Sequence, residues 1–167
     1  SETGMLFKSG GYIKYMSTSS YGIELYYKNT DGEQITPILS WGDAVTEINN
    51  LAAGNSNAKN QEYEIRLLRD QGTAADTTSA PMTLPMPGKN AAKNIKIVSS
   101  DKDAVCNIYY RGAITANSSV TLENVALNQK YQVGKTRTWR LSSYYSTPLT
   151  ITLTSGALYV GEQVSFN

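Results

Sequence analysis

The chain has 167 residues, and its 15 lysines and arginines nearly balance its 14 aspartates and glutamates. A formal net charge of +1 gives no electrostatic reason to expect a nucleic acid as a partner. Its apolar runs of about four or five residues are too short for insertion into a membrane. The length fits one domain, or a small domain with a cap.

Residues 12–16 and 23–27 alternate between apolar and polar side chains, which predicts two strands. The Asn-Thr-Asp-Gly turn at residues 29–32 precedes a third strand, and Pro37 ends that strand or places it at the edge of a sheet. We therefore expect residues 1–39 to form an N-terminal β-meander that caps the rest of the chain.

The helix signal lies at residues 40–52, where Ser40 is a favourable N-cap and Asp43 follows three residues later. A stripe of apolar side chains recurs at helical spacing and comprises Trp41, Ala44, Val45, Ile48 and Leu51. We expect one buried helix face, with Trp41 packed under a sheet.

From residue 62 onward, turn residues separate short predicted strands at 63–68, 82–86, 94–98, 106–110, 120–127, 149–153, 157–160 and 164–166. Residues 112–122 and 156–166 share the pattern G-A-[IL]-x-[AV]-x-x-x-V-[ST]-[LF]. With a long insertion expected at 128–147 left out, their offset is about 24 residues, typical of one coil of a parallel β-helix. Residues 94–97 and 120–123 share a weaker similarity at a similar step.

These patterns predict a mostly-β protein: a right-handed parallel β-helix, a short solenoid of about three coils, with an N-terminal β-meander and one capping α-helix. A single coil cannot bury its apolar face alone, so coils must stack, and the open ends of the stack need caps. We expect residues 40–167 to hold the capping helix and the coils, with the insertion at 128–147.

Three segments carry a family resemblance: the helix at 40–50, the strand at 63–68 and the coil at 119–127. Together they resemble the opening of pectate-lyase-like right-handed parallel β-helix proteins, especially modular surface proteins of Gram-positive gut bacteria associated with cellulosomes or adhesion. The resemblance spans residues 40–167. It implies a secreted, cell-surface location; such proteins include adhesins, scaffolds and polysaccharide-binding parts of larger enzymes, and others are lyases or glycosidases.

No catalytic residue and no cofactor is predicted. Polygalacturonase-like members use a Gly-His-Gly segment, and this chain has no histidine. Glycoside hydrolysis needs two facing carboxylates, but the nearest acidic pair, Asp101 and Asp103, lies in an evident turn. That pair is also a weak metal candidate, well short of the six to eight oxygens that Ca²⁺ takes. The single cysteine, Cys106, lies in an apolar stretch and is expected to be a small buried side chain.

The expected insertion is the best candidate for ligand binding, because aromatic faces stack on sugars while basic groups and hydroxyls bind sugar oxygens. The candidate residues are Tyr131, Lys135, Arg137, Trp139, Arg140, Tyr144 and Tyr145. A second interpretation stays open, in which this segment is a β-hairpin folded across the solenoid, with Trp139 and Tyr144 in the core.

The many tyrosines and small polar residues, with few charges, favour a secreted or cell-surface protein. We expect a non-catalytic bacterial module of a larger protein that binds polysaccharide or cell-wall glycan, or is adhesive. Two alternatives stay open. One is the N-terminal part of a β-helix polysaccharide lyase or glycosidase. The other is a structural stalk or scaffold that binds a protein partner, or a second copy, through the open end of the solenoid.

Overall fold

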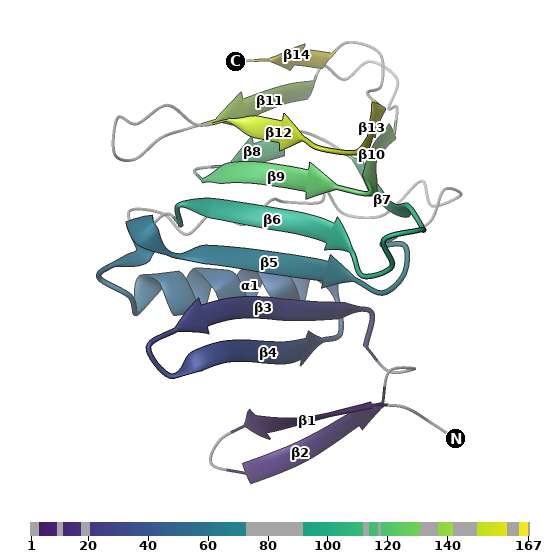
Figure 1. Cartoon of the computed structure of the whole chain (residues 1–167). Coiled ribbons are helices and arrows are strands. Elements are labelled where there is room, and N and C mark those ends of the chain that lie inside the picture. Colours follow the sequence, from purple (N-terminus) through teal and green to yellow (C-terminus); the bar gives the residue numbers. More distant parts are fainter. Residues whose placement is uncertain are drawn as a thin grey trace.

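The computed structural model describes residues 4–9, 12–17, 21–72, 92–111, 114–116, 118–130, 137–141, 150–159 and 164–166. Within these residues the protein is mostly β, as predicted, with one α-helix and one short 3₁₀ helix (Figure 1). The strands form one six-stranded, two three-stranded and one two-stranded sheet.

The six-stranded sheet has the strand order β12-β9-β6-β5-β3-β4. Its parallel strands are β5 (Glu62–Leu67), β6 (Asn94–Ser99), β9 (Ser119–Glu123) and β12 (Ile151–Leu153). Two antiparallel strands complete it, β3 (Ile23–Asn29) and β4 (Gly32–Ile38). Pro37 lies on the edge strand β4, which agrees with its predicted place because an edge tolerates the missing N–H donor.

Two further sheets are parallel throughout. The first contains β7 (Cys106–Arg111), β10 (Val125–Lys130) and β13 (Gly156–Tyr159). The second contains β8 (Ile114–Ala116), β11 (Arg137–Leu141) and β14 (Val164–Phe166). From β6 onward the chain visits the three larger sheets in a fixed order, so each sheet takes every third strand.

A column of apolar side chains crosses the inner face of the six-stranded sheet. Leu25, Ile65, Ile97, Leu122 and Leu153 are neighbours in register on five successive strands. The first four are 0% exposed, whereas Leu153, on the edge strand β12, is 42% exposed. Because alternate residues of a strand point to opposite faces, in-register pairing aligns these side chains. Each fully buried side chain of this size contributes about 1.5–3 kcal/mol.

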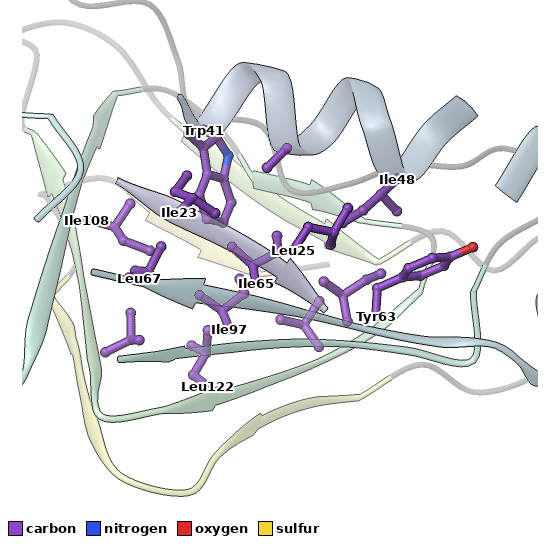
Figure 2. Close-up of a cluster of buried hydrophobic side chains, with 14 of the residues drawn as sticks. Ile23, Leu25, Trp41, Ile48, Tyr63, Ile65, Leu67, Ile97, Ile108 and Leu122 are labelled. Atoms are coloured by element: carbon purple, nitrogen blue, oxygen red, sulfur yellow. The ribbon is translucent and has the colours of Figure 1, made fainter. Parts of the chain in front are cut away.

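The helix α1 (Trp41–Ala53) covers the inner face at the β3 end of this sheet (Figure 1). Its first turn is capped as predicted, since the Ser40 hydroxyl accepts a hydrogen bond from the Asp43 backbone N–H at 3.2 Å. Figure 2 shows Trp41 pointing from the helix toward Ile23 of β3, and Ile48 pointing toward Leu25 of the same strand. The predicted burial of Trp41 under a sheet is therefore confirmed.

The predicted N-terminal meander is divided between two sheets. β1 (Gly4–Ser9), which the sequence does not predict, pairs with β2 (Tyr12–Ser17) in a separate hairpin. β3 pairs with β5 rather than with β2, and Leu25 lies opposite Ile65. Alternation identifies a strand but not its partner, which is chosen by burial of the inner side chains.

The two Gly-Ala stretches are not equivalent positions of a repeat. Residues 114–116 belong to β8 and pair with β11, whereas β13 pairs with β10 in another sheet. The alignment was wrong because short strands of different sheets share similar apolar spacing, so a few matching letters do not identify a sheet. The weaker similarity, between residues 94–97 and 120–123, does locate neighbouring strands, because β6 pairs with β9. Ile95 lies opposite Val120, so the register differs by one residue from the sequence alignment.

Candidate functional site

The segment 128–147 is not wholly an insertion. Residues 128–130 complete β10, and residues 137–141 form β11 between the parallel strands β8 and β14. Within the described residues, β11 therefore has no antiparallel hairpin partner. The sequence alone predicted an insertion here, either a binding loop or a β-hairpin, and not a single strand added to a parallel sheet.

Only some of the predicted ligand-binding residues lie in the part of the chain that the structure describes. The backbone of β11 carries Arg137, Trp139 and Arg140. The other four candidates lie outside the described residues: Tyr131, Lys135, Tyr144 and Tyr145. Binding by this set stays a prediction.

The turn between β6 and β7 holds Asp101 and Asp103. The Asp101 carboxylate accepts a hydrogen bond from the Asp103 backbone N–H at 2.9 Å, a local bond that stabilises the turn. Among the described residues, no three cysteines, aspartates or glutamates gather closely enough to hold a metal ion. Cys106, at the start of β7, is buried as predicted, with its sulfur 3.7 Å from the carbonyl oxygen of Leu67.

The outer face of the six-stranded sheet gathers polar side chains that the sequence analysis did not single out. Tyr26, Glu64 and Lys96 are in-register neighbours on β3, β5 and β6, one position along from the buried column. Arg66 on β5 and Glu123 on β9 lie on the same face, because each is one residue away from a buried residue of its strand. We call these five residues the polar face. In the sequence, these residues are the polar members of the alternating apolar and polar pattern of each strand.

Ion pairs, together with one contact between a cation and an aromatic ring, connect the polar face across four strands. The Lys96 ammonium lies 2.6 Å from a carboxylate oxygen of Glu123 and 3.6 Å from one of Glu64. Glu64 also contacts the guanidinium of Arg66, which lies 4.2 Å from the centre of the Tyr26 ring. These contacts hold the charged groups in fixed positions rather than leaving them on free side chains.

The electrostatics of Lys96 suit binding rather than proton transfer. The hydrogen bond to Glu123 raises the pKa of Lys96 above its ordinary value of 10.5, and the charge of Glu64 adds to that effect. A lysine that acts as a general base needs a lowered pKa, which burial without a counter-charge provides. Lys96 is instead a cation at neutral pH.

A pocket of about 440 Å³ opens where β5 and β6 begin. We call it the charged pocket, because its lining includes the charged residues Lys28, Glu62, Glu64, Lys93 and Lys96, together with Tyr26. Lys93 lies 3.9 Å from Glu62, whereas Lys28 forms no ion pair within the described part of the chain. The volume falls within the range of sites that bind small molecules.

A second pocket, of about 340 Å³, adjoins the first and shares Tyr27, Gln61 and Tyr63 with it. No charged side chain lines it, and the remaining lining residues are Asn29, Thr30, Leu51, Asn55 and Asn57. We call it the amide pocket. The rings of Tyr27 and Tyr63 lie 5.6 Å apart, and burial raises the pKa of both phenols, so their hydroxyls are neutral.

The candidate site therefore consists of the charged pocket, the amide pocket beside it and the polar face that continues from them. Comparisons of the chain with protein-family models, with curated proteins and with solved structures found no match. Across the described ranges, none of the helices has the length and apolar character to cross a membrane.

Proposed function

We propose that the protein is a non-catalytic bacterial module, secreted or on the cell surface, that binds polysaccharide as part of a larger protein. The observation that carries this proposal is Lys96, held as a cation between Glu64 and Glu123, on the same face where Arg66 lies over the ring of Tyr26. Sugar hydroxyls both donate and accept hydrogen bonds, so fixed donors and acceptors next to a ring suit them. Two adjoining pockets suit a chain of sugars better than a single sugar.

The proposed frame is a short right-handed parallel β-helix. It is supported by the recurrent order of the strands, because each pass along the chain adds one strand to each of the three larger sheets. The column that includes Ile65, Ile97 and Leu122 supports it too, since side chains of one coil pack on those of the next. Parallel crossover connections are almost always right-handed.

A glycan array tests the proposed function. Tyr26→Ala and Lys96→Gln are expected to weaken binding about tenfold, the effect of one or two lost interactions. Trp139→Ala and Tyr144→Ala are the matched comparison for the segment at 131–145. Loss of binding only in Trp139→Ala and Tyr144→Ala would indicate that the binding site lies at residues 131–145 instead. An array on which the wild-type protein binds no glycan, or mass spectra that show cleaved products, would contradict the proposal.

The outer edges of the three larger sheets favour a second candidate, an adhesive stalk that pairs with another copy of itself. β12, β13 and β14 each lie at the end of a strand order, and Leu153 on β12 is exposed at an inward position. Unpaired edges are templates for pairing with another chain. Sedimentation equilibrium should then show a dimer that Leu153→Lys dissociates, whereas a monomer at every concentration would rule this candidate out.

A further inference from the structure

Two asparagines of the amide pocket have one end of each side chain fixed by the protein. The carbonyl oxygen of the Asn29 side chain accepts a hydrogen bond from the Asp31 backbone N–H at 2.9 Å. The corresponding oxygen of Asn57 accepts one from Asn60 Nδ2 at 2.6 Å. Since a backbone N–H can only donate, the Asn29 amide cannot flip without losing this bond. The NH₂ groups of both asparagines are left as donors with no partner among the described residues.

The side-chain amide of Gln61 is held through its NH₂ group rather than through its oxygen. Its Nε2 donates to the backbone carbonyl oxygens of Lys28 at 3.0 Å and of Glu62 at 2.9 Å. Carbonyl oxygens can only accept, so the amide orientation is again determined by its partners. The Oε1 atom of Gln61 is therefore left as an acceptor, and the described chain provides no donor for it. The amide pocket thus has one donor of determined orientation, on Asn29, and one acceptor of determined orientation, on Gln61. Asn57 adds a donor, while the oxygen of Asn55 already accepts from the Asn57 backbone N–H at 2.9 Å.

The lining of the amide pocket determines what it can hold. It has no charged side chain, so an ionic ligand would lose water there without gaining a counter-charge. Tyr27 and Leu51 provide an apolar surface, and the oriented amides provide polar contacts at its margin. A sugar ring has the same division, with C–H faces and a rim of hydroxyls that both donate and accept.

We infer that the amide pocket binds one uncharged sugar unit, with the NH₂ groups of Asn29 and Asn57 donating to its oxygens and Gln61 Oε1 accepting from a hydroxyl. Because these amides are already held in place, little conformational freedom is lost on binding. This inference rests on the proposed polysaccharide-binding function and adds the chemistry of one sugar position. The shared lining places the next unit of the same chain beside the charged pocket.

Asn29→Asp and Asn57→Asp test the inference with little change to the fold. Each keeps the side-chain oxygen that accepts the local hydrogen bond and replaces the NH₂ donor by a carboxylate oxygen. The probes are the neutral tetrasaccharides of glucose, mannose, galactose and xylose, measured by isothermal titration calorimetry. We expect each variant to raise the Kd of the best-bound probe about tenfold. The control is Asn50→Asp, which adds the same charge on the exposed side of α1 and should leave the Kd unchanged.

The outcomes separate this inference from the proposed function. If Asn29→Asp and Asn57→Asp bind a neutral tetrasaccharide as tightly as the wild-type protein does, the sugar position is wrong while polysaccharide binding stands. The same holds if a glycan array shows binding only to charged glycans. If no glycan binds at all, both fail. Circular dichroism of each variant checks that its fold is retained.

Discussion

The ammonium of Lys96 on β6 lies 2.6 Å from the carboxylate of Glu123 on β9, the next strand of the sheet. The two residues are diagonal neighbours, since Lys96 lies directly opposite Thr121. Long side chains reach such diagonal positions on one face of a sheet. The same two strands are held together on their inner face by Ile97 and Leu122. One pair of strands thus supplies both a buried column and a charged outer surface.

The Lys96 ion pairs should contribute measurably to stability. We expect Lys96→Met to lower the free energy of unfolding in urea at neutral pH by about 0.5–1 kcal/mol, because the pairs are partly exposed. The matched control is Lys93→Met, since Lys93 and Glu62 are more exposed and lie 3.9 Å apart. Equal decreases in the free energy of unfolding of the two variants would show that the ion pairs of Lys96 add no more stability than the exposed pair of Lys93.

Alkaline pH should destabilise the fold. The hydrogen bond to Glu123 raises the pKa of Lys96, and burial raises the pKa of Tyr63, so the folded state holds both protons more tightly than the unfolded state. The stability from these groups is complete below their ordinary pKa values, 10.5 and 10.0, and is lost as the pH rises through the higher folded values. Urea unfolding at about pH 9 and pH 11 should show this decrease. A smaller decrease is expected in Lys96→Met, and an identical decrease would exclude the lysine as a cause.

The buried column predicts a large effect at its centre. Ile97→Ala removes a side chain with no exposed surface and should lower the free energy of unfolding by about 2–5 kcal/mol. Val105→Ala, at an exposed position before β7, should change it by less than about 0.5 kcal/mol. Similar values for the two, measured by chemical denaturation, would contradict the packing described for β5, β6 and β9.

The corner between β9 and β10 depends on the backbone of Asn124. Its φ of 52° is left-handed, a conformation that asparagine tolerates and alanine adopts at a cost of about 1–2 kcal/mol. Asn124→Ala and Asn124→Gly both remove the side-chain bond to the carbonyl oxygen of Lys102, so their difference isolates the backbone. We expect the glycine variant to have the higher thermal midpoint. The reverse order would be incompatible with a left-handed corner.

Some parts of the fold follow from local sequence. Ser40 caps α1 as predicted, because an N-cap needs only a hydroxyl within reach of the first free N–H groups. The strand predicted at 63–68 corresponds closely to β5, where alternation is clear. Pairing partners do not follow in the same way: β2 and β3 are adjacent in sequence, yet β3 pairs with β5. Partners are selected by burial across the whole chain, which local patterns do not contain.

The candidate site was harder to predict than the core. Sequence analysis favoured the concentration of aromatic and basic residues at 131–145, a local signal. The polar face is instead assembled from single residues on separate strands, such as Tyr26, Glu64 and Lys96. Each is unremarkable in its own segment, and only strand register brings them together.

Chemical-shift mapping by NMR with the glycan that binds best on an array tests the central claim most directly, because it locates the bound polysaccharide on the chain. Binding through the two pockets predicts that the largest amide shifts fall on Tyr26, Gln61 and Lys96. Shifts confined to residues 131–145, or an unchanged spectrum at saturating glycan, would contradict it.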